Sequence, residues 1–257
     1  MFDGEALAIL DAVAVSSSVN ALVKTLGMSK PTVISKIRRM ENMGLVTITE
    51  RKLEHRPGRP FKIIKTTERG SEIIRLARDA ELDELKASFR GEITLGIPES
   101  LAHYGVDMLV DRPSVVVPAR PKEKLSLIRS YIYDDRDFYE RSMPARYDLP
   151  VPKVEDLVLC MLKSRFDRLK VIPALMAQHV EGFDFSYLCS KARSQDVLGP
   201  TKFFLSAAAR LNPKVRRTVT SSASMRSCVN FSSLSRGRHG LPSFGEIRET
   251  YNMYVGA

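Results

Sequence analysis

The sequence predicts a mixed α+β protein, with an N-terminal helical part around one β-hairpin and a larger α/β part that ends in helices. Two observations lead to this prediction. Apolar residues recur at helical spacing through most of residues 1–90, and two short alternating runs interrupt them. Beyond residue 91, buried-strand patterns such as "SVVV" at 114–117 alternate with helical patterns.

The composition is that of a globular protein, with 44% hydrophobic and 27% charged residues. No apolar run approaches the ~20 residues that a membrane-spanning helix needs. The acidic start, MFDGEALAIL, lacks the basic segment of a signal peptide, so we expect a cytoplasmic protein with no membrane partner. The 3 widely spaced cysteines and 4 scattered histidines predict reduced thiols and no metal site.

Positive charge is the strongest bulk signal. The formal net charge is +10, which favours a polyanionic partner. Residues 20–69 alone carry 12 lysines and arginines against 4 glutamates. Because contacts to phosphate supply most of the non-specific affinity for nucleic acid, this local excess points to DNA.

Three helices are expected before the hairpin, the first of them ending at the serines 16–18. The second helix covers residues 19–26, starts after these serines and ends at Gly27. Ser29 is expected to cap the third helix, which tolerates Pro31 in its first turn. One face of this third helix is apolar, and the opposite polar face is expected to consist of Thr32, Ser35, Lys36 and Arg39.

The hairpin is predicted from two alternating runs, at residues 45–49 and 61–67. The loop between them holds a Pro-Gly turn that Arg56 and Arg59 flank. A long helix over residues 68–89 follows. It carries more apolar surface than a monomer of this size needs to expose, so we expect a homodimer.

This order of elements is that of a winged helix-turn-helix, in which the third helix enters the major groove and the hairpin lies beside it. The "GRP" at 58–60, the strand after it and "TTERG" are similar to the wing and strand exit of the MarR and ArsR superfamilies of regulators. A solvated basic face or a protein-contact module is the alternative. The expected DNA-binding residues are Ser29, Lys30, Thr32, Ser35, Lys36, Arg39, Arg51, Lys52, Arg56 and Arg59.

The second half resembles the nucleotidyltransferase-like domain of AbiEi-type antitoxins. Gly96, "ESLAHYGV" after it and "VPKVEDLVLCMLKSRFDRLKVIPAL" carry this resemblance. It implies an α/β nucleotidyltransferase-like domain over residues 91–212, and a toxin protein or a small-molecule effector as its partner. It also implies that the protein represses its own operon.

The sequence departs from an active transferase at the positions that matter for catalysis. Such an enzyme needs a Gly-Ser turn for the triphosphate and paired carboxylates for Mg²⁺. Here Gly96 is followed by Ile97 and Pro98, and the strand region carries a single acid, Asp111. Asp134, Asp135 and Asp137 are expected in a solvated helix end or loop. We therefore predict no catalytic residue, no metal and no cofactor.

Residues 213–257 are expected to form a basic, serine-rich extension. No acid occurs between Val197 and Gly245, where 8 cations lie. This segment is predicted either to make a second nucleic-acid contact or to be a loosely ordered extension or strands that complete the core.

The sequence as a whole thus predicts a sequence-specific DNA-binding transcriptional regulator that is not an enzyme. Residues 1–90 are its winged helix-turn-helix and double-stranded DNA is its partner. A repressor, and an autoregulating antitoxin in particular, fits this prediction. The alternative is a nucleotidyl- or phosphotransferase that acts near nucleic acid.

Overall fold

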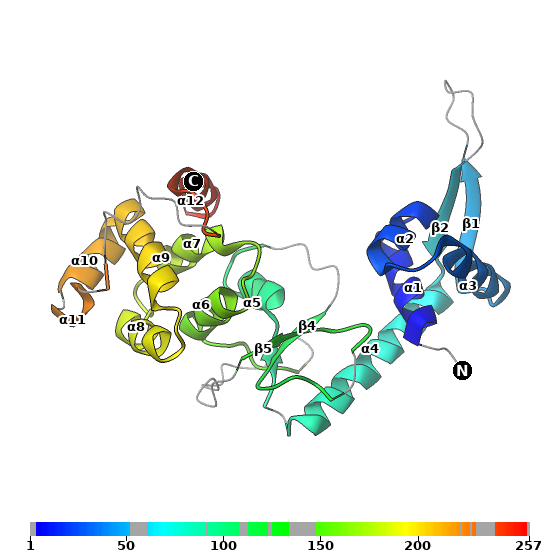
Figure 1. Cartoon of the computed structure of the whole chain (residues 1–257), viewed down its shortest axis with the longest axis horizontal. Coiled ribbons are helices and arrows are strands. Elements are labelled where there is room, and N and C mark those ends of the chain that lie inside the picture. Colours follow the sequence, from blue (N-terminus) through cyan, green and yellow to red (C-terminus); the bar gives the residue numbers. More distant parts are fainter. Residues whose placement is uncertain are drawn as a thin grey trace. The chain divides into compact units, whose positions relative to one another are not determined.

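The computed structural model describes residues 4–51, 61–90, 92–107, 113–122, 125–133, 148–221, 223–226, 228–229 and 240–255. It is a mixed α+β chain, as the sequence predicts (Figure 1). Contacts between backbone segments group the chain into two compact units. Unit 1 comprises residues 1–91, 111–113 and 121–129; unit 2 comprises residues 92–110, 114–120 and 130–257.

Unit 1 consists of helices around one antiparallel hairpin (Figure 1). Its elements are α1 (Gly4–Val15), α2 (Val19–Leu26), α3 (Lys30–Asn42), β1 (Val46–Arg51), β2 (Phe61–Thr66) and α4 (Glu68–Ser88). The Ser18 hydroxyl accepts the Ala21 N–H at 3.2 Å and caps α2. Gly27 ends α2 with a φ of 65°, in the left-handed region that glycine adopts without steric cost. The predicted caps of α2 are therefore confirmed.

One apolar cluster holds unit 1 together. Helices α1, α2, α3 and α4 and the inner face of the hairpin contribute to it, and its fully buried members include Ile9, Leu10, Leu22, Val33, Ile37 and Ile64. The hairpin register pairs Ile48 with Ile64, so both side chains point to the same face of the hairpin. That face packs against α1 and α3, which fixes the hairpin beside α3.

Helix α4 also holds a segment distant in sequence. The Glu81 carboxylate accepts the backbone N–H groups of Ser126, Leu127 and Ile128 at 2.6, 2.9 and 2.8 Å. Three donors on one carboxylate are a charge-assisted arrangement, which is stronger than neutral hydrogen bonds. Residues 126–128 therefore belong to unit 1, although the sequence assigned them to the second domain.

Unit 2 combines a three-stranded sheet with a helical core. The sheet has the order β3 (Thr94–Leu95), β4 (Ser114–Val117), β5 (Arg129–Ile132). The helices are α5 (Ile97–His103), α6 (Val154–Lys163), α7 (Ile172–Gln178), α8 (Phe185–Ser194), α9 (Leu198–Leu211), α10 (Pro213–Ser221), α11 (Ala223–Arg226) and α12 (Phe244–Tyr254). A short 3₁₀ helix, η2 (Leu169–Val171), precedes α7.

Helix α6 lies at the centre of unit 2. The apolar residues Val154, Leu157, Val158, Met161 and Leu162 predict a helix that packs on one side. This prediction is wrong, because every residue of 154–162 is buried. Helices α5, α8 and α9 all pack on α6 and cover it. Its burial includes two carboxylates, Glu155 and Asp156, which accept hydrogen bonds from the Asp184 N–H and the Tyr187 hydroxyl.

The segment predicted as a C-terminal extension contributes to unit 2. Val215 and Val219 of α10 and Ile247 of α12 are fully buried in its core. Ser243 and Glu246 form a reciprocal capping box at the start of α12. The described residues of 213–257 are therefore helices that complete the core. Strands or a loosely ordered segment were expected before residue 244, whereas the pattern of "FGEIRETYNMYVGA" after it is compatible with the short docking helix observed as α12.

The state of the cysteines and the length of the apolar helices complete the description of the fold. Cys160, Cys189 and Cys228 are all buried free thiols, and burial raises the pKa of Cys160 to about 12. Within the described ranges, no helix is long and apolar enough to cross a lipid bilayer.

Candidate nucleic-acid interface

Helix α3 is fixed at both ends by local contacts. The Ser29 hydroxyl accepts the Thr32 N–H at 3.3 Å and forms a second hydrogen bond with the Thr32 hydroxyl at 2.7 Å. Pro31 occupies the first turn, where its missing N–H costs no helical hydrogen bond. Gly44 follows the helix with a φ of 69°. The predicted start of α3 at Ser29 is thus confirmed.

The buried side of α3 determines which side faces outward. Val33, Ile37 and Met40 are at most 2% exposed and pack into the core of unit 1. The opposite side carries a shallow depression, which we call the α3 outer face. It is lined by Lys30, Pro31, Ile34, Ser35, Arg38, Arg39 and Asn42.

The predicted residues of α3 divide between this face and its flank. Lys30, Ser35 and Arg39 line the α3 outer face and are exposed. Thr32 is half-buried and bonded to Ser29 at the helix start. The Lys36 ammonium lies 2.9 Å from the Glu5 carboxylate of α1, and the Lys36 side chain is only 20% exposed. Lys36 therefore lies outside the α3 outer face.

Sequence reasoning missed Ile34, Arg38 and Asn42. The signal was present, because successive residues of a helix are 100° apart and the mean direction of Val33, Ile37 and Met40 can be computed. The direction opposite to it passes through Pro31, Ser35, Arg38 and Asn42. The polar pattern alone had favoured a stripe about a sixth of a turn away.

The α3 outer face continues towards the hairpin. A small cavity of about 180 Å³ lies between α3 and the hairpin, and Ile34, Arg38, Ile48, Lys62 and Ile64 are among the residues that line it. Lys62 is paired with Glu50 across the strands at 3.5 Å, but both side chains remain more than half exposed. Arg38 and Lys62 thus lie at the rim of one cavity, from two different elements.

The structure does not describe the side chains of the DNA-binding residues that were predicted in and next to the hairpin loop. Lys52, Arg56 and Arg59 lie outside the described residues, and so does the side chain of Arg51 at the end of β1. The described hairpin contributes the exposed cations Lys62 and Lys65.

The cations of the α3 outer face form no ion pair with the described residues. The ion pairs found within the described part of unit 1 involve Lys36, Lys62, Arg75 and Arg78. None of those pairs involves Lys30, Arg38 or Arg39. Their charge is therefore directed to solvent, where a phosphate or a base edge can accept it.

In unit 2, Gly96 and Glu99 belong to the segment that resembles a nucleotidyltransferase-like domain, and both contact Ser114. A Cβ on Gly96 would lie 1.8 Å from the Ser114 Oγ and 2.5 Å from the Ser114 carbonyl carbon. The buried Glu99 carboxylate accepts the Ser114 N–H at 2.7 Å and the Ser114 hydroxyl at 2.5 Å. Asp111, Asp134, Asp135 and Asp137 lie outside the described residues.

A buried carboxylate stands at the start of α6. The Tyr187 hydroxyl donates to Asp156 Oδ1 at 2.8 Å, and the Asp156 side chain is fully buried. Burial raises the pKa of Asp156 to about 6, and the neighbouring Glu155 adds to this rise. Among the residues that the structure describes, no group of three or more His, Cys, Asp or Glu side chains could hold a metal ion.

Comparisons with known proteins add nothing to this geometry. A scan against models of protein families, a search of curated proteins and a search of solved structures each returned no match. The function is therefore inferred from the residues of the chain and their arrangement.

Proposed function

We propose that this protein is a sequence-specific DNA-binding transcriptional regulator, and that unit 1 is its winged helix-turn-helix. The observation that carries the proposal is the α3 outer face. On this face Lys30, Arg38 and Arg39 are exposed, while the opposite side of α3 is buried. The major groove, about 12 Å wide, admits one α-helix, and residues of that helix reach base edges.

The hairpin supports the same mode of binding. It packs beside α3, and Lys62 lines the same cavity as Arg38, so cations from two elements lie next to each other on unit 1. Phosphates flank the major groove on both strands, and a second element beside the helix can bind them. In this mode Lys62 binds phosphate, while α3 lies over the bases.

We further propose that unit 2 binds a partner protein or an effector and performs no catalysis. Gly96 and Glu99 support this, since their contacts with Ser114 give both of them a structural role. We retain the expectation of a homodimer, because one such module buries little DNA and two-fold operators are common. A repressor fits this organisation, and so does an antitoxin that regulates its own operon.

The salt dependence of DNA binding tests the proposal. Full-length protein is titrated into a fluorescent 30-base-pair duplex at several salt concentrations. We expect log K to fall steeply with log salt, because bound cations release counterions from the phosphates. Replacing Arg38 and Arg39 together by alanine should weaken binding and make the slope less steep by about one to two.

A charge-matched control uses unit 2. Lys170 and Arg193 are exposed cations there, and their double alanine variant removes the same charge. This variant should bind the duplex almost as the wild type does. The proposal fails if the wild type does not bind duplex DNA, or if both double variants lose affinity equally.

A further inference from the structure

An apolar side chain lies among the cations of the α3 outer face. Ile34 is half-buried, and it lines both the outer depression and the cavity beneath the hairpin. Its side chain therefore lies between the two hollows. Pro31 extends the apolar surface by one turn and is exposed.

Ile34 and Arg38 are neighbours on this face. They are four residues apart, so their side chains lie on the same side of α3 on successive turns. Arg38 lines the same two hollows as Ile34. No carboxylate among the described residues forms an ion pair with Arg38, so its guanidinium is exposed for an external acceptor.

The two side chains match two different groups in the major groove. The apolar group that base pairs present there is the C5 methyl of thymine. The fork of an arginine matches the O6 and N7 acceptors of guanine. Four residues advance an α-helix by about 6 Å, and successive base pairs are about 3.4 Å apart.

We propose that Ile34 and Arg38 determine operator specificity, with Ile34 contacting a thymine methyl and Arg38 contacting a guanine no more than two base-pair steps away. This inference rests on the proposed function and goes further, because it names the bases that are read. The partner is then a DNA half-site with a T·A pair and a G·C pair at this short spacing.

The first experiment selects bound sequences from a randomised duplex library with the full-length protein. We expect the enriched motif to contain a thymine and a guanine within two base-pair steps. Uracil, which lacks only the methyl group, then replaces that thymine. Loss of one buried methyl should weaken wild-type binding about fourfold.

Variants assign each base to its side chain. Ile34→Ala should bind the thymine and uracil duplexes equally, because the alanine side chain is too short to reach the methyl from this position. Replacing the guanine by 7-deazaguanine removes the N7 acceptor and should weaken wild-type binding about fivefold. Arg38→Ala should not respond to that replacement. Thermal unfolding of both variants, followed by circular dichroism, establishes that they are folded.

The outcomes separate this inference from the proposed function. The inference is overturned if the duplex binds but no motif is enriched, or if the motif lacks the thymine or the guanine. Equal affinity of the wild-type protein for the thymine and uracil duplexes overturns it as well. It is also overturned if a folded Ile34→Ala variant still distinguishes thymine from uracil. In all these cases DNA binding itself stands. Absence of duplex binding overturns both. The comparison of the thymine and uracil duplexes uses wild-type protein, so it tests the contact with the thymine methyl even where a variant does not fold.

Discussion

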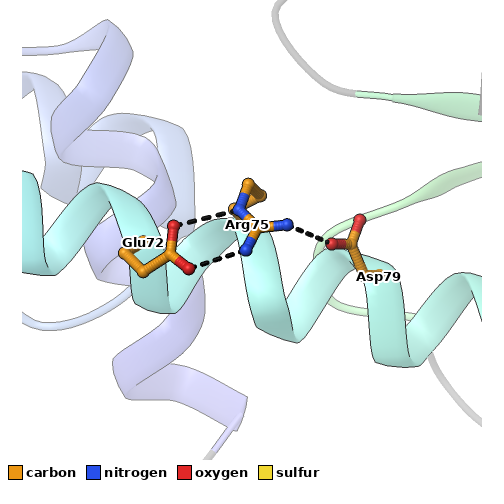
Figure 2. A network of polar contacts seen from close by, with 3 residues as sticks. All are labelled: Glu72, Arg75 and Asp79. Atoms are coloured by element: carbon orange, nitrogen blue, oxygen red, sulfur yellow. Dashed lines mark hydrogen bonds and ion pairs between the residues drawn. The ribbon is translucent and has the colours of Figure 1, made fainter.

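Arg78 of α4 forms an ion pair with Asp11 of α1, and the side chain of Asp11 is only 1% exposed. Three residues earlier on the same helix, Arg75 pairs with Glu72 at 2.6 Å and with Asp79 at 2.9 Å (Figure 2). All three side chains of this second network are at least half exposed. The two arginines share a helix and differ in the burial of their partners.

We predict that Arg78→Ala lowers the free energy of unfolding by about 3 kcal/mol, because it removes the counter-charge of a buried carboxylate. Arg75→Ala should leave it close to the wild-type value, since water screens exposed pairs. Urea unfolding followed by circular dichroism measures both. Equal losses would show that the burial of Asp11 does not matter to the stability of unit 1.

A second prediction compares Lys36 with Arg38. Because Lys36 is paired with Glu5 beside α1, Lys36→Ala should leave the affinity for the selected duplex within about twofold of wild type. Arg38→Ala should weaken it about tenfold or more, as the loss of a base contact does. Fluorescence anisotropy at fixed salt measures both. A larger loss for Lys36→Ala than for Arg38→Ala would favour the DNA-binding face predicted from the sequence, which includes Lys36.

A third prediction concerns Gly96. Gly96→Ala places a Cβ against the Ser114 backbone, so we expect a loss of about 1–3 kcal/mol in stability. At Gly182 a Cβ would meet nothing within 4 Å, and Gly182→Ala should stay within about 0.5 kcal/mol of wild type. Thermal unfolding of the two variants gives the comparison. A stable Gly96→Ala variant would show that β4 can move away from α5 at little cost.

The fourth prediction is a pH dependence that comes from Asp156. Burial raises its pKa from 3.8 to about 6 in the folded protein. The folded state therefore binds the proton of Asp156 more tightly than the unfolded state does. Its contribution to the free energy of unfolding is greatest below pH 4, where Asp156 is protonated in both states. That contribution is lost as the pH rises through about 6.

Asp156→Asn removes this titration and keeps an oxygen for the Tyr187 hydroxyl. The stability of the variant relative to wild type should therefore rise by about 2–3 kcal/mol between pH 4 and pH 7. Chemical unfolding at a series of pH values gives the difference. A difference that stays constant with pH would mean that folding leaves the pKa of Asp156 unchanged.

The amino-acid sequence by itself determined the helices and the hairpin of unit 1. Their ends depend on contacts within a few residues: Ser18 and Ser29 bond to N–H groups three positions on, and Gly27 adopts a left-handed conformation. Hydrophobic periodicity located α3 and both strands because each buries one side. The same local rules located β4, all of whose residues are buried.

Only the tertiary structure decided which cation of α3 forms an ion pair with another helix. Helical spacing can separate the directions of Lys36 and Arg38, but it does not show that α1 brings Glu5 to Lys36 and leaves Arg38 exposed. The complete burial of α6 and the place of residues 126–128 in unit 1 were decided in the same way. Each depends on contacts between residues tens of positions apart, and local propensity and periodicity carry no information about such contacts.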